Sequence, residues 1–98
     1  MSRIEFAPEV ADDFERILVH PVQHQEEDAA SRIQDIVAAI DALERNPMIG
    51  RPSGPRNREL VIGRRSRGYV ALYRYVAEID IVFVLAVRSQ SEAGYRSP

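Results

Sequence analysis

The sequence predicts an α+β fold in which a hairpin of two helices packs on one face of a four-stranded, mainly antiparallel sheet. Two observations predict it. Apolar residues recur at helical spacing up to residue 45, and from residue 59 onward the spacing changes to the period of two that is typical of strands. The order is therefore strand, helix, helix, strand, strand, strand. Because 98 residues suffice for one core and not for two, we expect a single domain over residues 1–98.

A short strand and an amphipathic helix come first. The alternating segment from Arg3 to Phe6 predicts a strand, and Pro8 ends it because proline is better suited to the first turn of a helix. We expect that helix to run from about residue 8 to Pro21, which ends or kinks it. Its apolar side consists of Val10, Phe14, Ile17 and Leu18. Its polar side consists of Asp12, Asp13, Glu15 and Arg16.

A second helix has the clearest pattern in the chain. Its apolar positions are Ala29, Ile33, Ile36, Val37, Ile40 and Leu43. The acidic residues 26–28 in its first turn and Arg45 in its last match the helix dipole, and Asn46-Pro47 supplies a stop. Since only a short linker joins the two helices, we expect them to form a hairpin.

The second half of the chain predicts a loop and three strands. Pro47 to Asn57 holds three prolines and two glycines, so we expect an irregular connection over the surface. The segments Glu59–Ile62, Tyr69–Val76 and Ile81–Val87 are separated by hairpin-length turns and predict an antiparallel meander. The last segment has almost no polar alternation, so we expect it inside the sheet with both faces covered.

Charge is divided unequally along the chain. The net charge is -2, yet residues 1–50 carry four arginines against eleven acids and residues 51–98 carry nine against four. The basic half predicts an acidic partner surface or nucleic acid. All thirteen basic side chains are arginine, so no lysine is available as a general base. The absence of cysteine excludes disulfides, a cysteine nucleophile and thiolate metal sites.

Neither a membrane nor a metal is indicated. The longest apolar run, Ile81 to Val87, is too short to span a bilayer, and the N-terminus lacks the pattern of a secretory signal, so we expect a cytoplasmic protein. His20 and His24 have the spacing of metal ligands. Pro21 disrupts the helix between them, however, and neither a cysteine nor a close carboxylate pair completes a site. We therefore expect surface histidines, with no metal and no cofactor.

Several short motifs follow one another along the chain. They are Ala11-Asp12-Asp13, Leu43-Glu44-Arg45-Asn46-Pro47, Gly50-Arg51-Pro52, Arg58-Glu59-Leu60-Val61-Ile62, Gly68-Tyr69-Val70-Ala71-Leu72-Tyr73-Arg74-Tyr75, Val84-Leu85-Ala86-Val87-Arg88 and Glu92-Ala93-Gly94-Tyr95. In this order they resemble the ParE/RelE superfamily over essentially the whole chain. The resemblance implies a RelE/ParE-like fold and the growth-arresting toxin of a bacterial type II toxin-antitoxin module. It also implies a partner, a cognate antitoxin that is a small DNA-binding protein with a segment that folds on binding, and hence a hetero-oligomer.

The resemblance leaves two activities open. RelE-like members cut messenger RNA on the ribosome, which requires a base, an acid and cations. The residues that would serve here are Arg74, Arg88, Glu92 and Tyr95. ParE-like members instead inhibit DNA gyrase by binding it. The pattern is closer to ParE because Val70 follows Gly68-Tyr69 where RelE has an arginine, and Ser89 follows Arg88 where many relatives have histidine. A degenerate member that only binds its antitoxin is the third alternative.

Arginines crowd the proline-rich loop and the first hairpin. They are Arg51, Arg56, Arg58, Arg64, Arg65 and Arg67. We interpret them, with Arg88 and Tyr95, as a surface that engages antitoxin, gyrase or nucleic acid, and a solvated turn is the alternative.

Two sets of strand residues also carry alternatives. Tyr69, Tyr73 and Tyr75 share one face of a strand, where packing is favoured over base stacking. The arginines at positions 74 and 88 either lie over a concave face or pair with Glu59 or Glu92.

Overall fold

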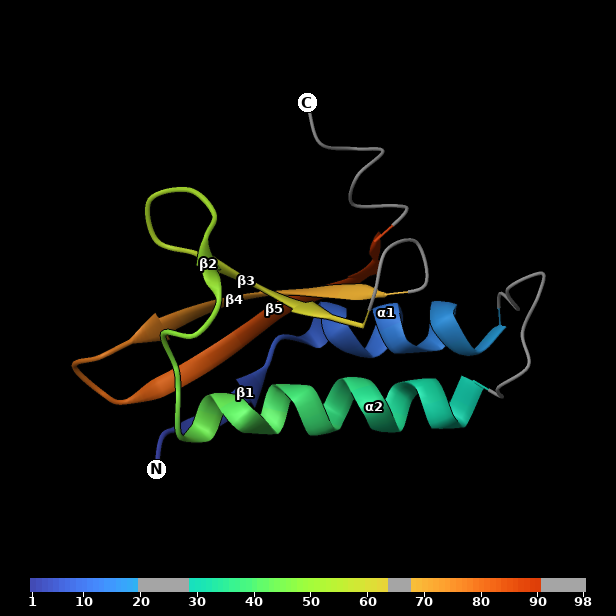
Figure 1. Cartoon of the computed structure of the whole chain (residues 1–98), viewed down its shortest axis with the longest axis horizontal. Helices are drawn as coiled ribbons and strands as arrows, with labels where there is room; N and C mark the ends of the chain where they lie inside the picture. The colour runs from blue at the N-terminus through green and yellow to red at the C-terminus, as the bar shows by residue number, and fades with distance from the viewer. Residues whose placement is uncertain (20–28, 64–67, 91–98) are drawn as a thin grey trace.

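Two helices pack on one face of a mixed five-stranded sheet (Figure 1). The computed structural model describes residues 1–19, 29–63 and 68–90. The strand order is β1-β5-β4-β3-β2, in which β1 (Arg3–Phe6) runs parallel to β5 (Ile81–Ser89) and the other neighbours are antiparallel. The predicted α+β class and the two helices on one face are confirmed, whereas the predicted number of strands is one too low.

The additional strand is β2 (Arg51–Pro52), which lies inside the segment that the sequence predicted to be irregular. It pairs antiparallel with β3 (Arg58–Ile62), with Arg51 opposite Glu59. The prediction of a wholly irregular connection is therefore wrong at these two residues. Proline is tolerated because β2 is an edge strand, and a two-residue strand is too short to produce a period-two pattern.

The helices and the longer strands lie close to their predicted positions. The structure has α1 at Pro8–Val19, α2 at Ala29–Asp41, a short 3-10 helix η1 at Ala42–Glu44 and β4 at Tyr69–Val76. β3 begins one residue before its predicted start, and β5 continues two residues past its predicted end, because backbone pairing with β4 extends beyond the apolar pattern. Neither α1 nor α2 combines the length and apolar character that a membrane crossing requires.

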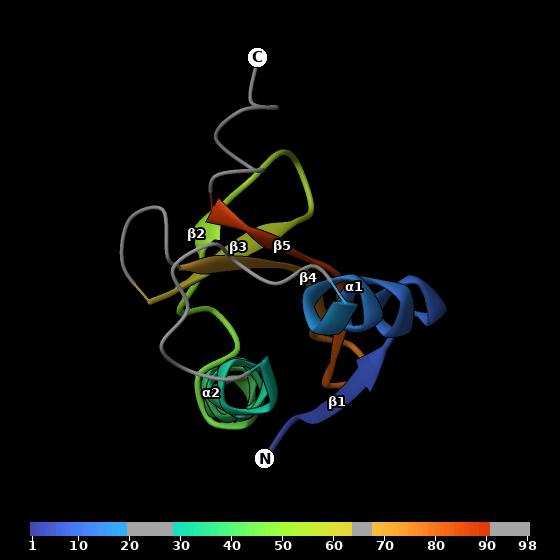
Figure 2. The same cartoon turned by 90° about the vertical axis from the view of Figure 1, so that its right-hand side faces the viewer.

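The core lies between the helices and the sheet, which Figure 2 shows as two separate layers. Helix side chains meet the helix-facing residues of β4 and β5 there. The buried residues include Val10, Ile17, Ile36, Ile40, Leu43, Tyr69, Ala71, Tyr73, Val82, Val84 and Val87. The packing interpretation of the tyrosine row is therefore confirmed for Tyr69 and Tyr73.

A β-bulge in β5 explains an irregularity in this core. Val84 and Val87 are both fully buried although they are three residues apart, which a regular strand would place on opposite faces. Tyr73 pairs with Val84 and Leu72 pairs with Ala86, so Leu85 is an extra residue on β5. β5 does lie inside the sheet as predicted. Its second face is nevertheless only partly covered, because Leu85 and residues 81 and 83 are half-buried.

Asp13 is buried, contrary to its predicted place on the polar side of the first helix. Only 4% of the residue is exposed, and its Oδ2 accepts a hydrogen bond of 2.9 Å from the Val87 amide. Parallel pairing with β1 ends where Phe6 lies opposite Val84, so the amide of Val87 has no strand partner on that side. The carboxylate of Asp13 takes the place of that partner, and Arg16 donates to its other oxygen at 3.2 Å. An aspartate in a helical polar stripe gives no sequence signal of this role.

Candidate functional site

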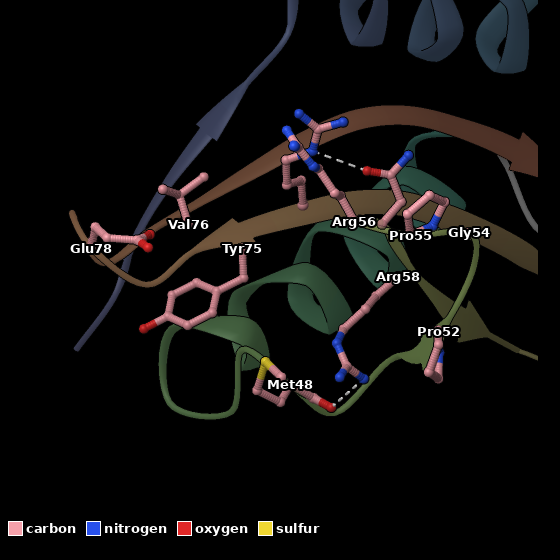
Figure 3. Close-up of a pocket in the computed structure, with 11 residues that line it drawn as sticks. Met48, Pro52, Gly54, Pro55, Arg56, Arg58, Tyr75, Val76 and Glu78 are labelled. Carbon is pink, nitrogen blue, oxygen red and sulfur yellow. Dashed lines mark hydrogen bonds between the residues drawn. The ribbon is translucent and has the colours of Figure 1, made fainter.

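A groove of about 520 Å³ lies on the face of the sheet, between the β2–β3 loop and β4 (Figure 3). The loop contributes residues 54–57, and β4 contributes residues 74–76. The lining is completed by Met48, Pro52, Arg58 and Glu78. The groove thus combines a proline-rich wall with a strand wall.

One buried hydroxyl group anchors the segment that leads into β2. The Tyr73 hydroxyl donates a hydrogen bond of 2.8 Å to the carbonyl of Pro47 and accepts one of 2.8 Å from the amide of Gly50. Gly50 has to be a glycine here, because a Cβ atom would lie 2.7 Å from both the Tyr73 hydroxyl and the backbone oxygen of Glu59. The segment before β2 is therefore fixed against β3 and β4.

Arg58 belongs to the same anchor. Its Nη1 donates to the carbonyl oxygens of Met48 (3.1 Å) and Gly50. Burial raises the pKa of Tyr73, although the Gly50 hydrogen bond and the positive charge of Arg58 oppose this rise. Arg58 is thus a structural cation that holds carbonyl groups, and the Tyr73 hydroxyl keeps its proton at neutral pH.

Two other arginines of the groove face it with unused donors. Arg74 donates from Nε to Asn57 Oδ1 at 3.1 Å, which orients its guanidinium group. Its terminal nitrogens have no hydrogen-bond partner within residues 1–19, 29–63 and 68–90. Arg56 is exposed and has no polar partner within the same residues. The groove can therefore bind an anionic group through two planar donor forks.

The remaining predicted arginines are placed differently. Arg51 forms an exposed ion pair of 3.1 Å with Glu59, a type of pair that contributes little stability. Glu59 consequently does not pair with Arg74. Arg88 is exposed opposite Val70, which lies four positions along β4 from Arg74, so the two arginines are separated by about 13 Å along the strand. Arg64, Arg65, Arg67, Glu92 and Tyr95 lie outside the described residues.

The strands that form this face offer no free general base. Glu59 is the only carboxylate in β3, β4 and β5, and it is ion-paired. The hydroxyl of Tyr75 donates to Asp80 Oδ1 at 2.7 Å, and this hydrogen bond is the main cause that raises the pKa of Tyr75. Arginine stays protonated at neutral pH. These strands can therefore bind anions but cannot readily accept a proton.

A second hollow of about 450 Å³ adjoins the groove and has a more apolar lining. Its lining is mostly apolar, with one carboxylate from Glu5. The apolar residues are Phe6, Ala7, Pro8, Phe83 and Leu85, and Arg74 and Val76 are shared with the groove. Phe6 is 46% exposed. Sequence reasoning missed this hollow, because it joins β1 to β4 across β5 and so depends on the strand order.

Metal ligation has no support in the described part of the chain. Residues 1–19, 29–63 and 68–90 contain no group of three side chains suited to a metal ion. His20 and His24, whose spacing raised the question, lie outside these residues.

Comparison with known proteins gives one family and several structures of the same fold. The family described as the ParE toxin of the type II toxin-antitoxin system parDE matches residues 4–94. The chain is similar to a structure of the chromosomal ParDE system of P. aeruginosa, with 27% identity and a TM-score of 0.73 over 91% of this chain and 96% of that one. No curated protein matches.

Two E. coli structures share the fold at lower identity. The intact RelBE toxin-antitoxin complex matches with 18% identity and a TM-score of 0.63, over 91% of this chain and 96% of that one. The isolated RelE toxin matches with 20% identity and a TM-score of 0.63, over 98% of each chain.

Proposed function

Because the chain belongs to the ParE toxin family of type II toxin-antitoxin systems, we propose that it binds DNA gyrase and inhibits it, and that a cognate antitoxin neutralises it. Both partners would meet it in the cytoplasm. The antitoxin is proposed by analogy with the P. aeruginosa ParDE system and the E. coli RelBE complex, whose toxin chains resemble this one.

The absence of a free base on the described strands is the observation that supports binding over catalysis. Cleavage of RNA by its own 2'-hydroxyl needs a group that accepts a proton. Within β3, β4 and β5, Glu59 is paired with Arg51, and the pKa values of Tyr73 and Tyr75 are raised. A protein that inhibits by binding needs none of these groups.

The positions of the cations support the same conclusion. A nuclease stabilises a single phosphate, so its cationic donors must converge to about 3 Å from that group. Arg74 and Arg88 are instead separated by about 13 Å along the strand direction. Such separated cations suit a protein surface that meets a large partner at several points.

The test is a supercoiling assay with purified gyrase, relaxed plasmid, ATP and the antitoxin-free protein, repeated after antitoxin is added. We expect inhibition that antitoxin reverses. Arg88→Gln should inhibit more weakly, whereas Arg45→Gln, an exposed arginine in the turn after η1, should inhibit like the unmodified protein.

Failure of the folded protein to inhibit gyrase would overturn the proposal. Growth arrest with cleaved messenger RNA would then establish the ribosome-dependent endonuclease, whose base would have to come from outside the described strands. Normal growth would instead indicate a non-toxic member that only binds its antitoxin.

A further inference from the structure

The cationic groove and the apolar hollow adjoin each other. Arg74 and Val76 line both, with Arg56 on the groove side and Phe83 and Leu85 on the hollow side. We infer that this surface, called here the composite groove, binds an extended acidic segment of the antitoxin. A carboxylate would lie between Arg56 and Arg74, and an apolar side chain two residues away would fill the hollow. The inference rests on the antitoxin partner of the proposed function.

The unused arginine donors indicate a carboxylate. Arg56 and Arg74 line one groove, and neither has an ion-pair partner in the described part of the chain. Two like charges that share a groove repel each other, and a carboxylate between them replaces this repulsion with attraction. Because Asn57 holds the Nε of Arg74, the terminal nitrogens of that guanidinium group are already oriented to donate to a ligand.

The apolar part of the composite groove favours a peptide over a nucleic acid. Polynucleotide sites follow the phosphate backbone with a track of cations. Here Arg51 is paired with Glu59, and Nη1 of Arg58 donates to two carbonyl groups, so Arg56 and Arg74 do not continue into a track of cations. An extended peptide presents alternate side chains to one surface, which matches a cationic site beside an apolar one.

The composite groove is also preformed. Tyr73 and Arg58 fasten the segment from Pro47 to Gly50, and Asn57 of the loop wall is hydrogen-bonded to Arg74, so both ends of the loop are held before any ligand arrives. Binding of a partner segment should therefore carry only a small entropic cost from ordering this chain.

The first experiment is an NMR titration of the ¹⁵N-labelled full chain with two probes, acetyl-Asp-Ser-Leu-amide and acetyl-Asn-Ser-Leu-amide. We expect the aspartate probe to shift the Nε signals of Arg56 and Arg74 and the amides of Phe83 and Leu85. Its affinity should be at least about tenfold higher than that of the asparagine probe, which corresponds to about 1.4 kcal/mol. Equal affinities, or shifts confined to other residues, would overturn the inference.

Substitutions make the same titration specific to the composite groove. Arg74→Gln should abolish the preference for aspartate, and Arg74→Lys, which keeps the charge but loses the planar fork, should retain part of it. Arg45→Gln is the matched control and should behave like the unmodified chain. If Arg74→Gln keeps the full preference while its spectrum shows a native fold, the carboxylate does not bind at Arg74.

The second experiment asks which partner fills the composite groove. In the complex purified after co-expression with the antitoxin, the aspartate probe should no longer shift Arg74, because the groove is occupied. Unchanged probe binding in that complex would exclude the antitoxin as occupant. An octathymidylate oligonucleotide that binds the free chain more tightly than the peptide, and depends on Arg74, would assign the site to nucleic acid. No step uses gyrase, so a failure of the supercoiling assay would leave these results standing.

Discussion

Removing the hydroxyl group of Tyr73 should cost a large share of the stability of this small domain. The group is fully buried, donates to Pro47 and accepts from Gly50, both at 2.8 Å. Tyr73→Phe keeps the ring but leaves the Gly50 amide and the Pro47 carbonyl without this partner. A buried group left unsatisfied costs about 1–3 kcal/mol, so we expect a loss of roughly 2–4 kcal/mol in the free energy of unfolding. That loss would lower Tm by roughly 8–32 °C in a domain of this size.

The assay is urea denaturation followed by circular dichroism, with Tyr75→Phe as the matched control. Tyr75 lies two residues along the same strand and also donates from its hydroxyl, but to Asp80 in an exposed turn. Water can replace that hydrogen bond, so the unfolding midpoint should change much less. Equal shifts in the two variants, or an unchanged midpoint in Tyr73→Phe, would refute the role assigned to the buried hydroxyl.

The pH dependence provides a second check on Tyr73. Burial raises its pKa above the ordinary value of 10.0, so the folded protein holds this proton more tightly than the unfolded chain does. The stabilisation is fully present below pH 10 and is lost as the pH rises through the folded pKa. The difference in unfolding free energy between the unmodified protein and Tyr73→Phe should therefore be constant from pH 7 to pH 9 and shrink at higher pH.

Three further changes test other parts of the fold. Gly50→Ala places a Cβ atom 2.7 Å from the Glu59 backbone oxygen, so we expect a loss of about 1–3 kcal/mol in the same denaturation assay, and an unchanged midpoint would contradict the close packing. Asp13→Ala removes the acceptor of the Val87 amide and should speed hydrogen exchange at that amide, whereas Asp13→Asn should retain part of the protection. The Ser2 hydroxyl, followed by that of Tyr75, lowers the pKa of Asp80, so this stabilisation is present above pH 3.8 and lost as the pH falls through the folded pKa. Ser2→Ala should therefore lower Tm at pH 7, and this difference should shrink as the pH falls below 3.8, whereas a difference that stays constant with pH would rule out this linkage.

The sequence predicted the secondary structure well because burial imposes a period on the long elements. Strand β4 lies at its predicted residues, and α1 begins at Pro8 as expected. The features that the sequence did not predict depend on contacts between residues that are far apart in the chain. The extra residue Leu85 in β5 follows from pairing with β4, and the buried Asp13 follows from β1 ending before Val87. Both are properties of the strand order, which no local pattern contains.

The candidate site was predicted in composition but not in arrangement. Sequence reasoning identified the loop arginines and Arg74, and the structure brings Arg56, Arg58 and Arg74 to one groove. It expected Arg74 either on an open face or paired with Glu59, and it placed Arg88 in the same candidate set. The structure separates Arg88 from Arg74 along the strands, because Arg88 pairs with Val70 near the opposite end of β4. The Tyr73 hydroxyl fastens the start of the proline-rich loop, and no spacing in the sequence records that contact.

An excess of arginine does not by itself measure how much positive charge a partner can use. Arg51 is ion-paired with Glu59, and Nη1 of Arg58 donates hydrogen bonds to two carbonyl groups of its own chain. Of the four arginines at positions 51, 56, 58 and 74, only Arg56 and Arg74 have neither an ion-pair partner nor a terminal nitrogen committed to a hydrogen bond in the described part of the chain. Replacing Arg58 by a neutral residue should therefore weaken partner binding indirectly, because the segment before β2 is loosened. It should also lower the free energy of unfolding. Replacing Arg56 by a neutral residue should weaken binding without lowering the free energy of unfolding. This difference distinguishes a contact residue from a structural one.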